Sequence, residues 1–242
     1  MDSISDPRIT GEHVRRVPAE PNELTLVGVV HDHPASTYRV TRIIESLDPE
    51  VVALELPETA VPLFEAYARS GRSPPVFGGE MSAAIQASDA EAVGVDRPTL
   101  AYTGRLAKRL YRHRPPTATL RRVFSNTVAA ITHAFVCWFA GVVAARTGVR
   151  LEVDSPIPHD VDRWDAPVDQ ARDEQDQVRR STAFMRAFQS ASGTRASRFE
   201  DETREAHMAD RLASLRDGGS VVAVVGIQHL DPLAERLETT TG

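Results

Sequence analysis

Short apolar runs alternate along this chain with segments in which apolar residues recur every three or four positions. Apolar runs of about four to eight residues predict buried strands, and apolar residues that recur every three or four positions predict helices. The expected strands are 24–30, 51–56, 91–96 and 220–225. The helices expected between the first three strands are 37–46, 62–68 and 80–88. This alternation is typical of an α/β fold, here a central, mainly parallel β-sheet flanked by helices.

The chain between the third and the last strand is expected to be mainly helical. Its segments are a helical region at 100–145, an irregular Pro-rich connection at 153–168, a charged helix at 169–191, a loop at 192–197 and a helix at 199–216. We therefore expect a helical insertion, at about 100–197, within a single α/β domain that covers 23–242. The polar segment 1–22 is expected to be flexible.

One stretch of the central region, 123–145, contains no charged residue and is flanked by Arg121, Arg122 and Arg146. A transmembrane helix needs about 20 predominantly apolar residues, so the stretch is long enough to span a bilayer. Its apolar character is diluted by Ser125, Asn126, Thr127, Thr132, His133 and Gly141. We therefore expect a buried core helix or a helix–helix interface, and a membrane-spanning helix is the alternative.

Composition narrows the function classes. A net charge of −6 argues against a nucleic-acid partner, because no basic face is implied. Cys137 is the only cysteine, which excludes an intramolecular disulfide and a cysteine-based zinc site. Residues 1–21 lack the apolar region of a signal peptide. We expect a cytoplasmic protein, with membrane association as the alternative, and a homodimer is compatible with the sequence.

A G-x-x-H pattern occurs twice, as Gly28 to His31 and as Gly226 to His229, each time after a strand-forming run. Glycine at the end of a buried strand lets the backbone turn sharply or approach another group closely. The histidine then lies at the end of a strand, where α/β proteins place their chemistry. We expect the two imidazoles to meet at one rim of the sheet.

Glu55 is the only charged residue in the apolar run 51–56. A buried carboxylate needs a cation, a metal or several hydrogen-bond donors. Its strand is expected to neighbour the first one, which would bring Glu55 close to His31. Two imidazoles and a carboxylate are a common ligand set for a catalytic divalent metal. The alternative is that Glu55 pairs with an arginine in a structural network.

Other charged residues are candidates for supporting roles. Asp96 and Arg97, at the end of the third strand, can supply a carboxylate and a cation facing the substrate, or can form an ordinary ion pair. Glu80 is expected to support the N-terminus of a helix. Arg204 is a candidate for holding an anion at the rim of the sheet.

Two further histidines lie close to these motifs, and we expect both to be solvated. His33 follows the first G-x-x-H pattern, and His207 lies on the helix before the second. The alternative for His33 is a ligand role, because the alternation His31-Asp32-His33 can place both imidazoles on one side of an extended segment. Neither a G-x-S-x-G elbow nor a phosphate-binding glycine loop is present, so serine hydrolase, NTPase and dinucleotide-binding functions have no support.

Several segments together resemble the TraB/PrgY family, which is related to GumN and the Tiki proteases. The matching segments are Leu26 to His31, Ser36, Pro49 to Leu56, Gly79 to Ile85, Val93 to Pro98, Arg204 to Ala209 and Val222 to His229. The resemblance implies an α/β fold of the erythromycin-esterase/ChaN-like type. It also implies that both G-x-x-H histidines and the strand glutamate belong to the active site.

The resemblance implies two functions. The first is a metal-dependent hydrolase of peptides, as in the Tiki branch, with a manganese-like or cobalt-like ion. Its implied metal ligands are His31, Glu55 and His229, and its implied supporting residues are Glu80, Asp96, Arg97 and Arg204. The second, as in the PrgY branch, is reduction of peptide-pheromone activity, by cleavage or by sequestration. The alternative to an enzyme is a non-catalytic module of the same fold that sequesters a small peptide or an anionic ligand through Arg97 and Arg204.

Overall fold

The computed structural model describes residues 6–18, 22–149, 153, 157–189 and 194–240. Its strands are β1 Val14–Val17, β2 Leu24–Val29, β3 Val51–Pro57, β4 Glu91–Asp96 and β5 Val221–Gly226. They form one five-stranded sheet in the order β1-β2-β5-β3-β4. Only β1 runs antiparallel to its neighbour, so the sheet is mainly parallel. The expected α/β fold is confirmed.

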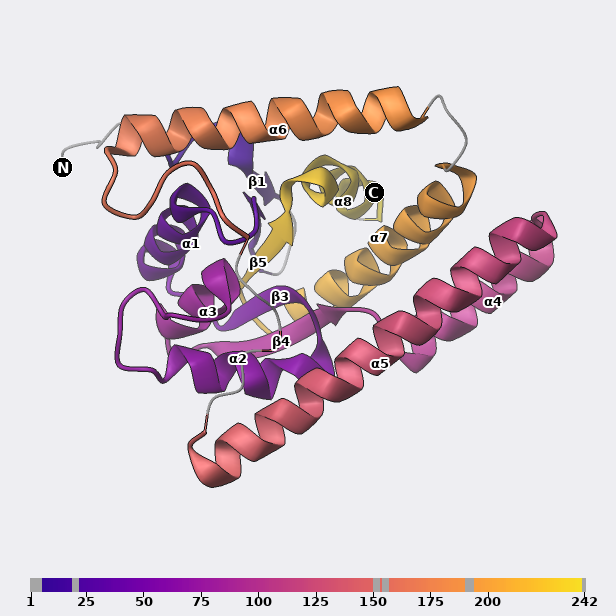
Figure 1. Ribbon diagram of the computed structural model, residues 1–242, viewed down its shortest axis with the longest axis horizontal. Coiled ribbons are helices and arrows are strands. Elements are labelled where there is room, and N and C mark those ends of the chain that lie inside the picture. The colour runs from indigo at the N-terminus through magenta and orange to yellow at the C-terminus, as the bar shows by residue number, and fades with distance from the viewer. Residues whose placement is uncertain (1–5, 19–21, 150–152, 154–156, 190–193, 241–242) are drawn as a thin grey trace.

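The described helices surround this sheet and include every helix expected from the sequence (Figure 1). They are α1 Pro34–Leu47, α2 Val61–Ala68, α3 Gly79–Gln86, α4 Leu100–His113, α5 Thr117–Thr147, α6 Pro167–Gln189, α7 Thr194–Arg216 and α8 Ile227–Thr240, with short 3-10 turns at Gly11–His13 and Glu58–Ala60. Because α7 begins at Thr194, the loop expected at 192–197 is wrong for 194–197, and 192–193 lie outside the described residues.

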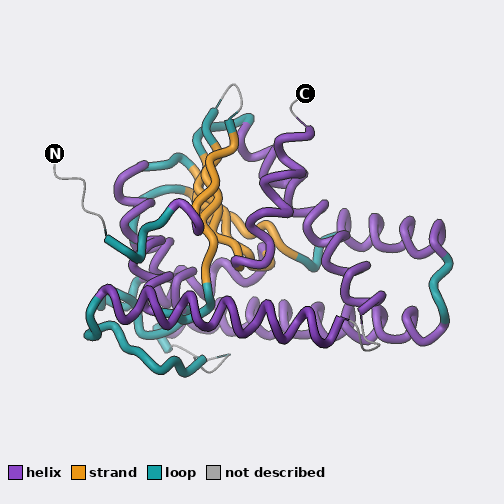
Figure 2. The backbone as a smooth tube through the Cα atoms, turned by 90° about the horizontal axis from the view of Figure 1, so that it is seen from above, coloured by secondary structure: helices purple, strands orange, loops and turns teal. Residues whose placement is uncertain are grey.

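Two apolar cores hold helices on both faces of the sheet (Figure 2). Side chains alternate between the faces of a strand, so Leu26 of β2 faces one core and Val27 faces the other. The first core includes Met208 and Leu212 of α7 together with Leu233 of α8. The second is closed by α1 and α3. Burial on both faces explains why the strands read as continuous apolar runs.

The strand order corrects one expectation about the site. Glu55 belongs to β3, which we expected to neighbour β2, but β5 lies between them. The register pairs Val29 of β2 with Gly226 of β5, and Leu54 of β3 with Val224 of β5. The last strand of the chain is therefore the middle strand of the sheet, and it brings the second G-x-x-H pattern between the first pattern and Glu55.

The segment for which we expected flexibility contains a strand. β1 pairs with β2, with Val14 opposite Val27, and Val17 is buried in the first core. An edge strand of four residues with Arg15 and Arg16 at its centre gives a weak sequence pattern. Short, charged edge strands also resist pairing with other chains.

The central region forms a helical hairpin of α4 and α5 at the side of the domain (Figure 1). α5 is long and apolar enough to cross a membrane, yet only 28% of its most apolar window is buried. It packs on α2 through one side, where Cys137 and Ala140 contact Leu63 and Tyr67. It is therefore a helix–helix interface along one side rather than a fully buried core helix.

Candidate functional site

The three residues expected to share a site lie at one edge of the sheet. His31 lies in the turn after β2, Glu55 lies near the end of β3, and His229 lies in the first turn of α8, directly after β5. The parallel strands β2, β5 and β3 are neighbours, so their carboxyl ends meet at the same edge. Shared topology therefore places the three residues at the same edge of the sheet, where Nε2 of His229 lies 3.6 Å from Oε1 of Glu55 and the Glu55 charge acts on His31.

The two G-x-x-H patterns have different backbones, although we expected both histidines to end a strand. After Gly28 the strand continues to Val29, and a turn with Asp32 at a φ of 59° precedes α1. After Gly226 a helix begins at once, so His229 is helical. An identical spacing of glycine and histidine thus presents the two imidazoles from a turn and from a helix.

Glu55 is buried and its carboxylate is fully paired. Its Oε2 atom accepts a hydrogen bond of 2.6 Å from the backbone N–H of Gly226. Its Oε1 atom accepts one of 2.6 Å from Nη2 of Arg204. The sequence left open whether Glu55 pairs with an arginine or holds a metal, and the first of these pairings is present here.

Arg204, from α7, lies at the centre of the site. Its Nε and Nη2 atoms donate to the two carboxylate oxygens of Asp96 over 2.6 and 2.5 Å. Its Nη1 atom lies 3.1 Å from Nε2 of His229. Burial alone would lower the pKa of Arg204, but the Asp96 and Glu55 carboxylates raise it, so the guanidinium stays charged. The anions that Arg204 holds in this structure are thus carboxylates of the chain itself.

The contacts of His229 determine its tautomer. Because Arg204 can only donate, Nε2 of His229 is the acceptor and carries a lone pair. The proton of the neutral ring is then on Nδ1, which donates to Oε1 of Glu205 over 3.2 Å. Nε2 also lies 3.6 Å from Oε1 of Glu55. His229 thus directs a lone pair toward the charged guanidinium of Arg204.

His31 is held in a similar way by a different glutamate. Its Nδ1 atom lies 2.7 Å from Oε1 of Glu80, and Oε2 of Glu80 accepts a 2.8 Å hydrogen bond from the backbone N–H of Asp32. The hydrogen bond to Glu80 raises the pKa of His31 to about 9, with burial opposing it and the Glu55 charge adding to it. Glu80 is the first-turn acid of α3, but its role is to hold this turn rather than only to support the helix.

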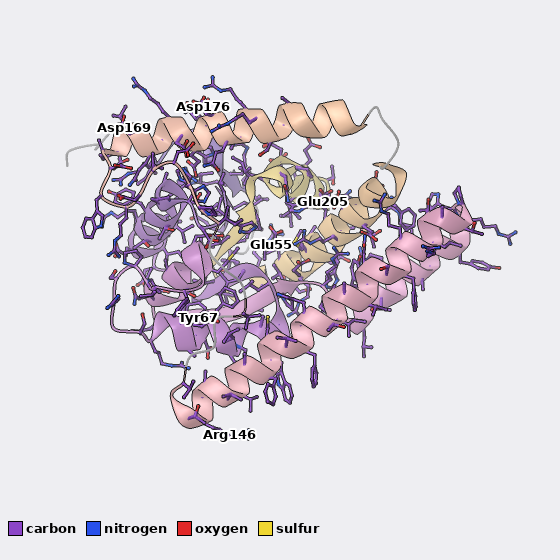
Figure 3. The ribbon with its side chains drawn as sticks, in the orientation of Figure 1. Glu55, Tyr67, Arg146, Asp169, Asp176 and Glu205 are labelled. Atoms are coloured by element: carbon purple, nitrogen blue, oxygen red, sulfur yellow. The ribbon has the colours of Figure 1, made fainter. Side chains whose placement is uncertain are left out.

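Both histidines are therefore oriented at Nδ1 by a buried glutamate, which leaves Nε2 for another partner. Carboxylates in this position fix the tautomer and ring direction of histidines that bind metals. Figure 3 shows Glu55 at the end of the sheet and Glu205 on the neighbouring α7. Glu205 was missed in the sequence, where it is one of several acids on a charged helix. The arginine directly before it, Arg204, gave the only local signal.

The remaining candidates have structural partners. Arg97 donates from Nη1 to the Tyr102 hydroxyl over 3.2 Å and lies 3.9 Å from Glu200, so it forms no ion pair with Asp96. His207, which we expected to be solvated, is buried, and its Nε2 atom lies 3.1 Å from the Thr99 hydroxyl. The contacts of Glu200 with Arg97 and of His207 with Thr99 connect α7 with the residues just before α4.

A second cluster, formed by His33, His159 and Asp173, has ligand atoms within 4.8 Å of one another. We expected a solvated His33, but its side chain is completely buried. Nδ1 of His33 accepts a hydrogen bond of 3.1 Å from the backbone N–H of Ala35, so Nε2 carries the proton and donates to Asp173 over 3.2 Å. No lone pair of the neutral His33 ring is left for a metal.

His159 continues this network to the first G-x-x-H turn. Its Nε2 atom donates to the backbone carbonyl of His31 over 2.8 Å, and its Nδ1 atom lies 2.7 Å from Nε2 of Gln177. The cluster is thus explained as a chain of hydrogen bonds that ties the His31 turn to α6. The His31 turn is therefore held by this network from α6 and by Glu80 from α3, and none of the network residues belongs to a sequence motif.

A scan of protein-family models finds no match to this chain, and a search of curated proteins finds none either. The resemblance to the TraB family therefore rests on the quoted segments, and its functional implications are proposals.

Proposed function

We propose that this edge of the sheet is the active site of a metal-dependent hydrolase acting on peptides. The proposal is carried by the pair of histidines whose Nδ1 atoms are held by Glu80 and Glu205. Histidines that bind a catalytic metal almost always have such a partner on their other ring nitrogen. The peptide substrate rests on the TraB resemblance alone.

The donor set fits a divalent cation. Nε2 of His31, Nε2 of His229 and the Glu55 carboxylate would hold it, since imidazole and carboxylate together are a common ligand set for a catalytic divalent metal, and the family resemblance implies a manganese-like or cobalt-like ion. Arg204 currently donates to Glu55 and lies against His229. A bound metal would compete with the guanidinium for Glu55 and His229. It would not compete for Asp96, so the two hydrogen bonds between Arg204 and Asp96 could remain.

The surrounding charge also favours a cation. Glu80 and Glu205 add two buried carboxylates to Glu55 and Asp96. Arg204 is bound between Glu55 and Asp96, Arg236 lies 3.5 Å from Glu205, and His31 carries a proton below its pKa of about 9, so four acids face three cationic groups. Burial raises the pKa of Asp201, a further acid close to Arg204, and the Arg204 charge partly offsets this. The excess of negative charge is reduced when a divalent ion binds.

A bound divalent ion supplies a water molecule of lowered pKa and polarises a substrate carbonyl. The residues of the chain have separate tasks. Glu80 and Glu205 keep the two imidazoles in one tautomer and orientation. Asp96 keeps Arg204 at the site, where the N–H groups that a bound metal would displace from Glu55 and His229 could stabilise the negative charge that develops on a carbonyl oxygen during hydrolysis.

The rival function is sequestration of a peptide or an anion through Arg97 and Arg204. The geometry favours it less, because Arg204 is neutralised by Glu55 and Asp96, and Arg97 is engaged with Tyr102. An anion would have to displace these buried contacts before it gained a charged partner.

Hydrolysis of a mixture of fluorogenic peptides tests the proposal, using protein that has been stripped of metal and then loaded with Mn²⁺. We expect His31→Ala and His229→Ala to lose at least about 100-fold in turnover, the upper end of what loss of a supporting residue costs. His113→Ala, which changes an exposed histidine on α4, is the control. Turnover that persists in both site variants contradicts the proposal, and saturable peptide binding without turnover favours sequestration.

A further inference from the structure

The outer side of α5 carries a continuous apolar stripe. Its members follow one another at intervals of three or four residues and so lie on one side of the helix; they are Leu120, Phe124, Val128, Ile131, Phe135 and Trp138. Each is at least 38% exposed. Figure 3 shows side chains of α5 projecting from this outer side, away from the sheet. Exposed apolar residues that gather in this way mark an interaction surface.

The other side of α5 is fixed on the protein by small residues. Ala134, Ala140, Gly141 and Ala144 are buried there. A Cβ atom added to Gly141 would lie 2.9 Å from the backbone nitrogen of Leu63, so the two helices are in close contact. A helix docked in this way presents one apolar face to its surroundings, as a helix lying in a membrane interface does, rather than a whole apolar circumference.

The charge of the hairpin is opposite to that of the rest of the chain. Residues 97–151 contain ten arginines and lysines, including the only lysine, Lys108, and no aspartate or glutamate. The other residues contain 18 arginines and all 34 acids. Arg105 and Arg109 pair with Asp210 and Glu202 of α7. Basic residues of the hairpin that are exposed include Lys108, Arg112, Arg114, Arg121, Arg122 and Arg146.

We infer that the α4–α5 hairpin docks the protein on an anionic lipid surface. The stripe enters the boundary between headgroups and acyl chains, as amphipathic helices do to a depth of about 5–10 Å. Arg122 and Arg146 lie near opposite ends of α5, roughly 36 Å apart along the helix axis. Basic residues near such a surface add to its attraction for the protein.

Charge argues against a second copy of this chain as the occupant. Antiparallel pairing of two stripes would place Arg146 beside the copy's Arg121 and Arg122, and parallel pairing would place each arginine beside itself. The hairpin has no acid to balance either arrangement. A nucleic acid would use the basic residues but would leave the aromatic stripe exposed to water. An anionic membrane matches both features.

Flotation of the full chain with lipid vesicles tests the inference. One set of vesicles contains phosphatidylcholine alone, and the other contains phosphatidylcholine and phosphatidylglycerol in a ratio of about 7:3, near the anionic content that gives a strong surface potential. We expect binding to the anionic vesicles only, with at least about a tenfold loss when sodium chloride is raised from about 0.05 to 0.5 M.

Matched variants separate the two parts of the surface. We expect Phe135→Ser with Trp138→Ser, and separately Arg121→Gln with Arg122→Gln, each to weaken binding about tenfold or more. The controls are Trp164→Ser, which removes an exposed tryptophan outside the hairpin, and Arg42→Gln with Arg179→Gln, which removes two exposed arginines from α1 and α6. Both controls should bind like the unchanged chain.

Fluorescence gives a second readout that depends on position. The chain has two tryptophans, so Trp164→Phe leaves Trp138 as the only reporter. We expect its emission to shift to shorter wavelength when anionic vesicles are added. Absence of binding, equal binding to both vesicle types, or an unshifted Trp138 emission would overturn the inference. A dimer in solution that Phe135→Ser with Trp138→Ser dissociates would assign the stripe to a second copy instead.

Discussion

Each G-x-x-H histidine is held at Nδ1 by a glutamate from a separate helix, Glu80 of α3 and Glu205 of α7. At the scale of single residues, these contacts determine which ring nitrogen is available. The guanidinium of Arg204 contacts both Glu55 and His229, so a positive charge already lies between these two residues. The chemistry of the site therefore depends on residues outside the repeated motif as much as on the motif itself.

Glu205→Gln tests the role of the supporting carboxylate. Glutamine can still accept the Nδ1–H hydrogen bond, but it lacks the charge that makes the ring more basic. We expect Mn²⁺ affinity, measured by calorimetry, to fall about 10- to 100-fold. The control Glu202→Gln removes the charge of a glutamate on the same helix that pairs with Arg109 instead. Equal affinities in the two variants would assign Glu205 a purely structural role.

Arg204→Gln tests competition between the guanidinium and a metal. Without the arginine, Glu55 and Asp96 lose their shared partner, and breaking a buried ion pair of this kind costs about 3–5 kcal/mol. We expect thermal unfolding at a lower temperature than in the unchanged chain, and a larger stabilisation by Mn²⁺ than the unchanged chain shows. A variant whose unfolding temperature does not respond to Mn²⁺ would argue that Arg204 is itself the permanent occupant.

His31 makes stability depend on pH. Its pKa is raised from 6.5 to about 9, mainly by the hydrogen bond to Glu80. A raised pKa means that the folded chain holds the proton more tightly than the unfolded chain. The contribution is therefore fully present below pH 6.5 and is lost as the pH rises through about 9.

The measurement is the free energy of unfolding of the metal-free chain and of His31→Ala between about pH 6 and 10. We expect the difference between them to shrink steadily with rising pH. Because the His31 side chain is 49% exposed, salt should reduce the effect. A difference that stays constant with pH would contradict the role given to the Glu80 contact.

At the scale of elements, α6 is attached to the sheet edge by two polar connections. One is the network through His159 to the His31 carbonyl. The other is the buried pair of Arg39 and Glu174, in which Ser36 donates a 2.5 Å hydrogen bond to Glu174 and Arg39 donates a 2.9 Å bond to the Gly28 carbonyl. Burial would raise the pKa of Glu174, but Arg39 holds it below its usual value.

Glu174→Ala should therefore destabilise the fold by about 3–5 kcal/mol, because it leaves the buried Arg39 charge unpaired. Asp176→Ala on the same helix is the matched control. Asp176 pairs with Arg179 on the exposed side of α6, where an ion pair contributes at most about 1 kcal/mol. Denaturant unfolding measures both changes, and similar costs would contradict the attachment proposed for α6.

The parts of the fold that could be predicted were those with local causes. Buried runs such as 221–225 and periodic segments such as 199–216 indicate their own element type. The insertion of β5 between β2 and β3 could not be read in this way, because strand pairing depends on contacts between distant segments. Burial of His33 and His207 was missed for the same reason, since α6 and α4 supply their partners.

Within the site, the glycine and histidine pattern pointed to His31 and His229, and an isolated acid in an apolar run pointed to Glu55. The supporting contacts were harder to predict. Glu205 stands among other charged residues of α7, and only the tertiary structure shows that it faces His229 rather than solvent.

At the scale of the whole molecule, charge is divided between two regions. Carboxylates gather around Arg204 and the histidines at the sheet edge, whereas the α4–α5 hairpin is basic and apolar. The first region suits a cation and the second suits an anionic surface. The net charge of −6 conceals this division. The overall composition therefore did not indicate that the α4–α5 hairpin is basic.

The central claim is that His31, Glu55 and His229 form one metal site. Its most direct test is Mn²⁺ titration of the metal-free chain, followed by electron paramagnetic resonance of the free ion. We expect one ion bound per chain with about one proton released near pH 7, since His31 must lose its proton to bind. His31→Ala and His229→Ala should each abolish this binding while remaining folded. Retention of the same stoichiometry and affinity in both variants, or no binding by the unchanged chain, would contradict the claim.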